Sequence, residues 1–102
     1  MFLDKYLNNL KLDIIYTNYN KEFINSLDED NFIKVYNLLK EKGFYYIDDI
    51  IINYLELFTL DKKSIEKSLN TIESLIKDNY IEYIGKNMSL FNKVISLAVN
   101  YN

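Results

Sequence analysis

The chain has 102 residues, 49% of them hydrophobic and 16% aromatic, with 12 lysines or arginines against 15 acidic residues. This length and apolar content predict one globular domain over residues 1–102. Because the sequence contains no Cys and no His, it excludes zinc fingers, thiol or imidazole catalysis and disulfides. No apolar stretch is long enough to span a membrane, so we expect no membrane partner and a cytoplasmic protein.

The charges are unevenly distributed along the chain. Residues 1–61 hold six lysines and eleven acidic residues, a formal charge of −5. Residues 62–102 hold six lysines and four acidic residues, a formal charge of +2. The net charge of −3 gives no general electrostatic reason to bind nucleic acid.

The first predicted element is a helix over residues 2–16. Its evidence is a stripe of apolar residues spaced four, three and four apart, namely Leu3, Leu7, Leu10 and Ile14. Residues 17–20, Thr-Asn-Tyr-Asn, predict a turn, because Asn side chains compete with helical hydrogen bonds. A short helical piece is expected around Phe23 and Ile24.

The central part of the sequence predicts two helices. Ser26 and Glu29 have the spacing of a capping box, which predicts a helix start, and Gly43 predicts the end of that helix, with Phe44 folding back on it. Residues 46–58 are apolar on most sides, so we expect them to form the most buried helix.

The last third of the sequence predicts a capped helix, an ambiguous segment and a final helix. Asp61 is a suitable N-cap for a helix that continues to about residue 78. Residues 80–85 fit either a short strand or a helical turn, and residues 89–99 again show helical spacing. The predicted fold is therefore an all-α compact bundle of five or six short helices.

Catalytic and metal-binding groups are scarce. The closest carboxylates are adjacent in sequence, at residues 28–30 and at Asp48 and Asp49. Adjacent side chains at a helix start diverge, whereas general acid–base catalysis needs two carboxyls across a cleft, so these residues fit the helix dipole better. The two glycines form no phosphate-binding loop and no EF-hand spacing occurs. We predict a protein that is not an enzyme and has no cofactor or metal.

Residues 31–85 contain a pattern found in a DNA-binding family. Ile72 and Leu75, followed by Asn-Tyr-Ile-Glu at residues 79–82, resemble the end of the recognition helix and the start of the wing in winged helix-turn-helix proteins. The resemblance covers about half of the chain. It implies a helix-turn-helix-like core, a minor β element near residues 80–85 and DNA as the partner.

The predicted helix after Asp61 carries residues compatible with DNA recognition. With Ile65 pointing inward, the residues farthest from the core are Lys63, Lys67, Asn70, Ser74 and Lys77. Lysines can contact phosphates, and Asn and Ser can contact base edges. A winged-helix-like DNA-binding regulator is therefore the alternative function.

The favoured function is protein–protein binding by an acidic surface. The candidate residues are the carboxylates of the two helix starts and the tyrosines between them, namely Asp28, Glu29, Asp30, Tyr45, Tyr46, Asp48 and Asp49. Such a surface can bind the basic face of a nucleic-acid-handling enzyme. In composition the chain is similar to immunity proteins and to phage inhibitors of defence nucleases.

A homodimer is a further alternative. The two terminal segments carry broad apolar faces that a small domain can leave partly uncovered, Leu3, Leu7, Leu10 and Ile14 at the start and Leu90, Phe91, Val94 and Leu97 at the end.

Overall fold

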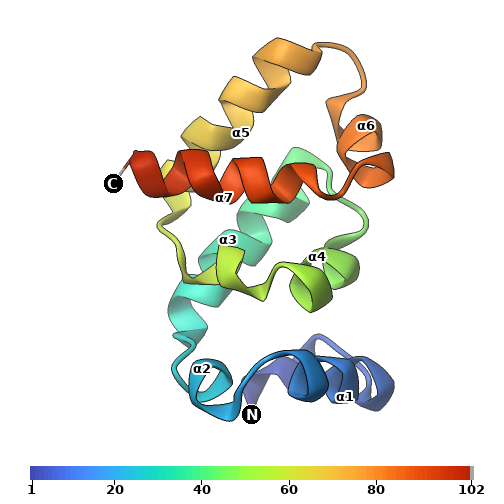
Figure 1. Ribbon diagram of the computed structural model, residues 1–102, viewed down its shortest axis with the longest axis vertical. Helices are drawn as coiled ribbons and strands as arrows, with labels where there is room; N and C mark the ends of the chain where they lie inside the picture. The colour runs from blue at the N-terminus through green and yellow to red at the C-terminus, as the bar shows by residue number, and fades with distance from the viewer. Residues whose placement is uncertain (102) are drawn as a thin grey trace.

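The computed structural model describes residues 1–101 and is all-helical over that range (Figure 1). Its elements in chain order are η1 (Phe2–Lys5), α1 (Asn9–Asn18), α2 (Lys21–Asn25), α3 (Glu29–Lys42), α4 (Ile47–Asn53), η2 (Leu55–Thr59), α5 (Lys62–Ile76), α6 (Tyr80–Lys86) and α7 (Leu90–Asn100). The two η elements are 3₁₀ helices. The all-α prediction is confirmed, with more helices than the five or six expected.

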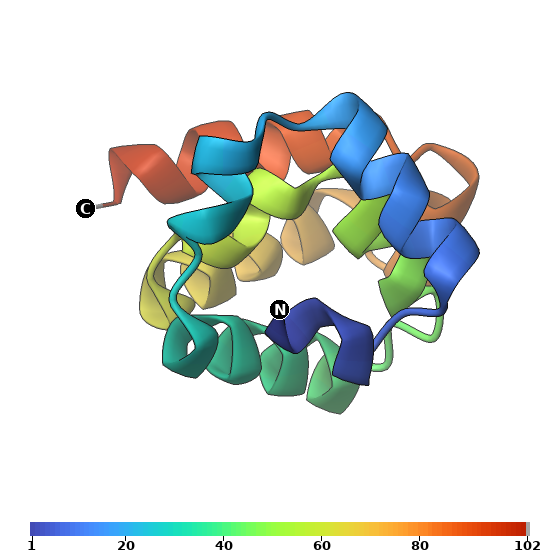
Figure 2. The same ribbon diagram turned by 90° about the horizontal axis from the view of Figure 1, so that it is seen from below.

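The helices follow one another along the longest of the 37 × 28 × 21 Å dimensions. In Figure 1, η1, α1 and α2 lie at one end, α3, α4 and η2 in the middle, and α5, α6 and α7 at the other end. Figure 2 shows η1 beside α3 and α1 beside α4. Elements that are close in sequence therefore lie close in space, and the two chain halves occupy different ends of the molecule.

The core is built around four fully buried phenylalanines. The rings of Phe32 and Phe58 stack with centroids 4.7 Å apart, and those of Phe44 and Phe91 lie 5.8 Å apart. Each pair joins different elements, α3 with η2 and the α3–α4 turn with α7. Burying one such ring contributes about 1.5–3 kcal/mol. The first pair stabilises the middle of the molecule, and the second joins the middle to α7.

Two predicted helix boundaries are confirmed in atomic detail. Gly43 follows α3 with a φ of 98°, and the Phe44 N–H donates to the Leu39 carbonyl at 3.0 Å. Glycine adopts the left-handed backbone conformation at little energetic cost, which is why α3 ends here. At the start of α5, the Asp61 carboxylate accepts from the Ser64 N–H at 3.2 Å.

The predicted helix over residues 2–16 is wrong. The chain forms η1, breaks, and restarts as α1, because the Asn8 side chain accepts from the Lys11 N–H at 2.9 Å and so caps a new helix. Leu3 and Leu7 are buried, whereas Leu10 and Ile14 face solvent. The expected single apolar stripe is therefore divided between the core and the surface.

Two further predictions near the second turn are wrong. The turn expected from residue 17 begins later, since α1 continues to Asn18. The N-cap of α3 is Asp28, which accepts from the Asp30 N–H at 2.9 Å, rather than Ser26. The Ser26 hydroxyl instead donates to the Phe23 carbonyl at 2.6 Å. The short helix around Phe23 is confirmed as α2.

The expected long helix over residues 46–58 is divided into α4 and η2, with the break at Tyr54. A straight helix would spread these apolar residues around its circumference, whereas the break turns both segments toward the core. Leu55 and Leu57 are completely buried as a result. The Leu55 N–H donates to the Tyr19 hydroxyl at 3.1 Å, which fixes the break.

The β element suggested for residues 80–85 is wrong, because this segment is helix α6. Tyr80 and Ile84, one helical turn apart, are both buried, while Glu82 is exposed. In a strand all three side chains would share one face and the Glu82 carboxylate would point inward. Residues 1–101 therefore hold no wing of the winged-helix kind.

Candidate functional site

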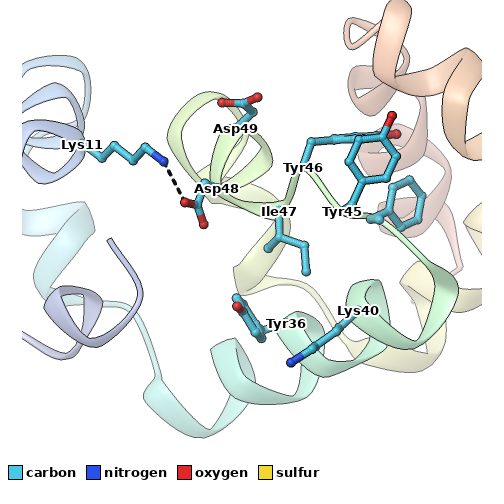
Figure 3. A pocket seen from close by; sticks show the side chains of 9 residues that line it. Lys11, Tyr36, Lys40, Tyr45, Tyr46, Ile47, Asp48 and Asp49 are labelled. Carbon is cyan, nitrogen blue, oxygen red and sulfur yellow. Dashed lines mark hydrogen bonds and ion pairs between the residues drawn. The ribbon is translucent and has the colours of Figure 1, made fainter. Parts of the chain in front are cut away.

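A charged hollow lies at the start of α4 (Figure 3). Its volume is about 500 Å³. It is lined from α1, α3 and the start of α4 by Lys11, Tyr36, Lys40, Phe44, Tyr45, Tyr46, Ile47, Asp48 and Asp49. Four of the seven residues predicted for the acidic surface are among these nine. We call the hollow lined by these nine residues the charged hollow.

One carboxylate of the charged hollow is paired and the other is not. The Lys11 ammonium donates to the Asp48 carboxylate at 2.8 Å, and Figure 3 shows Lys11 reaching across from α1. The hydrogen bond to Asp48, and then its charge, raise the pKa of Lys11. Asp49 points elsewhere in Figure 3 and is exposed. The unpaired charges of the lining are therefore the negative charge of Asp49 and the positive charge of Lys40, which is exposed and has no ion pair among the described residues.

Tyr45 is an exposed aromatic side chain held in a fixed position. It is 71% exposed, yet its hydroxyl donates to the Glu82 carboxylate on α6 and its ring meets the Tyr46 ring edge-on, with centroids 5.0 Å apart. The hydrogen bond to Glu82, followed by partial burial, raises the pKa of Tyr45. A large ring held in this way loses little entropy on binding.

Tyr46 anchors α6 to the charged hollow. Its hydroxyl donates to the Ile81 carbonyl at 2.6 Å. Its ring packs on Gly85 so closely that a Cβ added there would lie 2.9 Å from the Tyr46 Cε1. Burial raises the pKa of Tyr46, because the ionised phenolate would lose its hydration. Tyr46 is thus a structural support for Tyr45 rather than a free contact residue.

The other predicted acidic residues lie elsewhere. Asp28 and Asp30 are exposed at the start of α3, and Glu29 pairs with Lys5 at 3.0 Å. On α3 the charged hollow is lined by Tyr36 and Lys40, about 12 and 18 Å along the helix from Asp28 at 1.5 Å per residue. The structure therefore does not join the two acidic clusters into one surface.

Four of the five alternative DNA-binding residues lie on the solvent side of α5, and the fifth, Lys77, directly follows the end of this helix with a φ of 69°. Lys63, Lys67, Asn70, Ser74 and Lys77 are exposed. The Lys42 ammonium donates to the Asn70 side chain at 3.2 Å, which adds a positive charge to this face. A hollow of about 380 Å³ at its start is lined in part by Lys34, Lys62 and Lys63.

The helix-turn-helix-like core differs from the expected arrangement. Residues 54–61, including η2, separate α4 from α5. A helix-turn-helix joins its two helices by a turn of about three or four residues. The α5 helix packs mainly on α7 and α3.

Sequence reasoning missed five of the nine residues that line the charged hollow, namely Lys11, Tyr36, Lys40, Phe44 and Ile47. It also missed Glu82, which accepts a hydrogen bond from Tyr45. Lys11 and Glu82 lie 37 residues away from Asp48 and Tyr45, respectively, and no local pattern links such positions. Tyr36 packs against the core and also lines the hollow. Only a tertiary structure could find these neighbours.

Within residues 1–101, no cluster of three or more acidic side chains is placed to share a metal ion. Over the same range, no helix combines the length and apolarity that crossing a bilayer requires. Comparisons of the chain with protein-family models, with curated proteins and with solved structures found no match. The function is therefore argued from the geometry alone.

Proposed function

We propose that this protein is not an enzyme and that it acts by binding another protein through the charged hollow. The observation that carries the proposal is Tyr45, 71% exposed beside Asp48 and Asp49 at the edge of a hollow of about 500 Å³. Tyr is among the residues most enriched at interface hot spots, and carboxylates around it select a basic partner.

The partner we propose presents Lys or Arg side chains, as the nucleic-acid-handling enzymes do. Asp49 is available to a partner cation. Asp48 forms an ion pair with Lys11 at 2.8 Å, and this pair must break before Asp48 can pair with a cation of the partner. Exchange of one surface ion pair for another costs little, because both are solvated. An inhibitor of the immunity or phage anti-defence type, residing in the cytoplasm, would use such a surface.

The lining of the charged hollow favours binding over catalysis. It contains no Ser, Thr, Cys or His, so it lacks the usual nucleophile and base pairs. Asp48 and Asp49 leave the first turn of α4 in different directions (Figure 3). They therefore do not face each other across a space for a substrate, as two catalytic carboxylates must.

The test is capture of partners from native cell extract by three immobilised proteins. The wild type is compared with Asp48→Lys/Asp49→Lys and with Glu22→Lys/Asp30→Lys, which makes the same change in net charge at exposed carboxylates outside the charged hollow. We expect the hollow variant to lose a partner that the control keeps. Identical partner sets from all three proteins would contradict the proposal.

A second candidate function is DNA binding by α5, because four polar or basic side chains share the solvent side of this helix and Lys77 directly follows its end. If it holds, a gel shift of duplex DNA by the wild type should weaken steeply with salt and disappear in Lys63→Glu/Lys67→Glu. Loss of counterions on binding causes that salt dependence. No gel shift at low salt would contradict this candidate.

A further inference from the structure

The molecule has a second hollow, an apolar groove between α5, α6 and α7. Its volume is about 340 Å³. It is lined by Thr71, Ile72, Leu75, Ile76, Tyr83, Leu90, Lys93 and Leu97. Leu75 is 74% exposed in this groove. Because exposure of leucine to water is unfavourable and the neighbouring lining is also apolar, binding of a partner over this groove would be stabilised by burial of apolar surface.

The walls of the apolar groove are joined by hydrogen bonds. Beneath it, the buried Ser68 hydroxyl donates to the Val94 carbonyl at 2.6 Å, which ties α5 to α7. At one end, the hydroxyls of Thr71 and Tyr101 are hydrogen-bonded at 2.9 Å. A groove that is already formed before binding spends little free energy on ordering when a partner enters.

The groove carries one charge, the Lys93 ammonium on α7. Lys93 follows Leu90 by three positions and precedes Leu97 by four, so it lies on the same helix face as these two lining leucines. Lys93 is exposed and no carboxylate pairs with it within residues 1–101. A suitable occupant therefore combines apolar side chains with one acidic side chain.

Helix α1 of the same chain has that chemistry on its outer side. Ile15 points inward and is completely buried. On the outer side, Leu10 is 71% exposed, and Ile14, one turn further along, is also exposed. Asp13 follows Leu10 by three positions, so it lies beside Leu10 on this side, and it is exposed with no ion pair among the described residues. The helix is thus apolar on two sides, and only one side is covered.

The groove and the outer side of α1 lie at opposite ends of the molecule. In Figure 1, α1 is at the lower end and the α5, α6 and α7 group is at the upper end. The α1 end, residues 1–27, holds three lysines and three acidic residues and carries no net formal charge. One copy therefore cannot fill its own groove, and the electrostatic attraction available to α1 of a second copy is the local one between Asp13 and Lys93.

We propose that the apolar groove binds α1 of a second copy of this chain, head to tail. Leu10 and Ile14 of one copy contact Leu75 and its neighbours in the next, and the Asp13 carboxylate pairs with Lys93. Because the two contacting surfaces differ, each added copy leaves one groove and one α1 free, and the copies form chains. The contact is smaller than a standard interface, so the association is weak and depends on protein concentration.

The test uses sedimentation velocity over a concentration series with two single variants. Leu10→Asp and Leu75→Asp change exposed side chains, and each puts an unpaired charge into one half of the contact. We expect the wild type to show an average mass that rises steadily with concentration, and each variant to be monomeric, with dissociation constants raised at least about tenfold. Circular dichroism verifies that both variants fold.

The decisive step is to mix the two variants. Leu10→Asp keeps an intact groove and Leu75→Asp keeps an intact α1, so an equimolar mixture should form a dimer that grows no further. Asn37→Asp and Val99→Asp are the matched controls, since they introduce the same charge at exposed residues outside the contact and should associate like the wild type. Reversing Asp13 and Lys93 together should restore the association that Asp13→Lys alone weakens.

Three results would overturn the proposal. A wild type that is monomeric at the highest attainable concentration would mean that another protein, or none, covers the groove. A mass that stops at two copies would indicate a symmetric dimer instead. Equal weakening by the control variants would show that only net charge matters. These results leave the charged hollow untouched, because Leu10 and Leu75 do not line it.

Discussion

The charged hollow and the apolar groove differ in the kind of side chain that each leaves exposed. The first presents Tyr45, Asp48 and Asp49, and the second presents Leu75 and Tyr83 around Lys93. A charged rim favours fast, salt-sensitive encounter with a basic partner, whereas an apolar groove favours slow dissociation of an apolar one. The two surfaces therefore suit different partners, and α6 links them, since it supports Tyr45 and supplies Tyr83.

The largest effect is expected at a buried residue that joins the charged hollow to α7, a helix that also lines the apolar groove. Phe44 lines the charged hollow and contacts the ring of Phe91 on α7. Phe44→Ala should lower the free energy of unfolding by about 3–5 kcal/mol, because it leaves a cavity in the core. Urea denaturation measures this, and both partner capture and self-association should weaken together. A loss under about 1 kcal/mol would show that Phe44 does not connect the two regions.

The next effect separates the support of the charged hollow from its rim. In Gly85→Ala, the new Cβ lies 2.9 Å from the Tyr46 ring. This steric overlap costs about 1–3 kcal/mol, whereas the higher helix propensity of alanine contributes at most about 1 kcal/mol. We expect lower stability and displaced Tyr45 and Tyr46 rings.

The matched control is Gly43→Ala, where the new Cβ meets no atom but the φ of 98° is unfavourable. It should cost about 1–2 kcal/mol without moving the tyrosines. Near-ultraviolet circular dichroism, which senses tyrosine surroundings, should therefore change in Gly85→Ala only. The same change in both variants would contradict the tight contact of Tyr46 with α6.

Alkaline pH should destabilise the fold through Tyr46, which lines the charged hollow. Burial raises the pKa of Tyr46 above 10.0, so the folded state holds this proton more tightly than the unfolded state does. The stabilisation is complete below pH 10 and disappears as the pH rises further, because ionisation then favours unfolding. The pKa values of Tyr19 and Tyr80, also raised by burial, act in the same direction.

Urea denaturation at a series of pH values measures this dependence. Tyr46→Phe should be less stable near neutral pH, since the hydrogen bond to the Ile81 carbonyl is lost. Above pH 10 its stability should fall less steeply than that of the wild type. Parallel curves for the two proteins would show that Tyr46 ionises equally in the folded and unfolded states.

The smallest stability effect is expected at the rim itself. Tyr45 is 71% exposed, so Tyr45→Ala should change the free energy of unfolding by less than about 0.5 kcal/mol. Its effect on binding should be much larger, as a faster dissociation of the captured partner, because an aromatic anchor is removed. Stability from urea denaturation and dissociation rates from surface plasmon resonance separate the two roles. Unchanged dissociation would remove Tyr45 from the interface.

Local signals in the sequence predicted the helices with strong end markers. The end of α3 at Gly43 and the start of α5 at Asp61 could be read from single residues, because their chemistry is local. The breaks at Asn8 and Tyr54 could not, because each depends on which apolar residues the remainder of the core accepts. Periodicity alone therefore joined segments that the structure separates.

The candidate site was predictable only in part, for the same reason. Tyr45, Tyr46, Asp48 and Asp49 are neighbours in sequence, and they remain neighbours in the charged hollow. The residues at 28–30 were grouped with them by charge, although the length of α3 keeps them apart. Composition shows how many charges a chain half carries, but only the packing of helices decides which of them share a surface.

The most direct test of the proposed function is the association rate of the captured partner, purified, measured by surface plasmon resonance at low and high salt. Binding through the charged hollow predicts a rate that falls with salt and falls again in Asp48→Lys/Asp49→Lys, since attraction between opposite charges speeds the encounter. Leu75→Asp, in the apolar groove, should leave that rate unchanged. A rate that ignores salt, or that depends on Leu75 rather than on the two aspartates, would contradict the proposal.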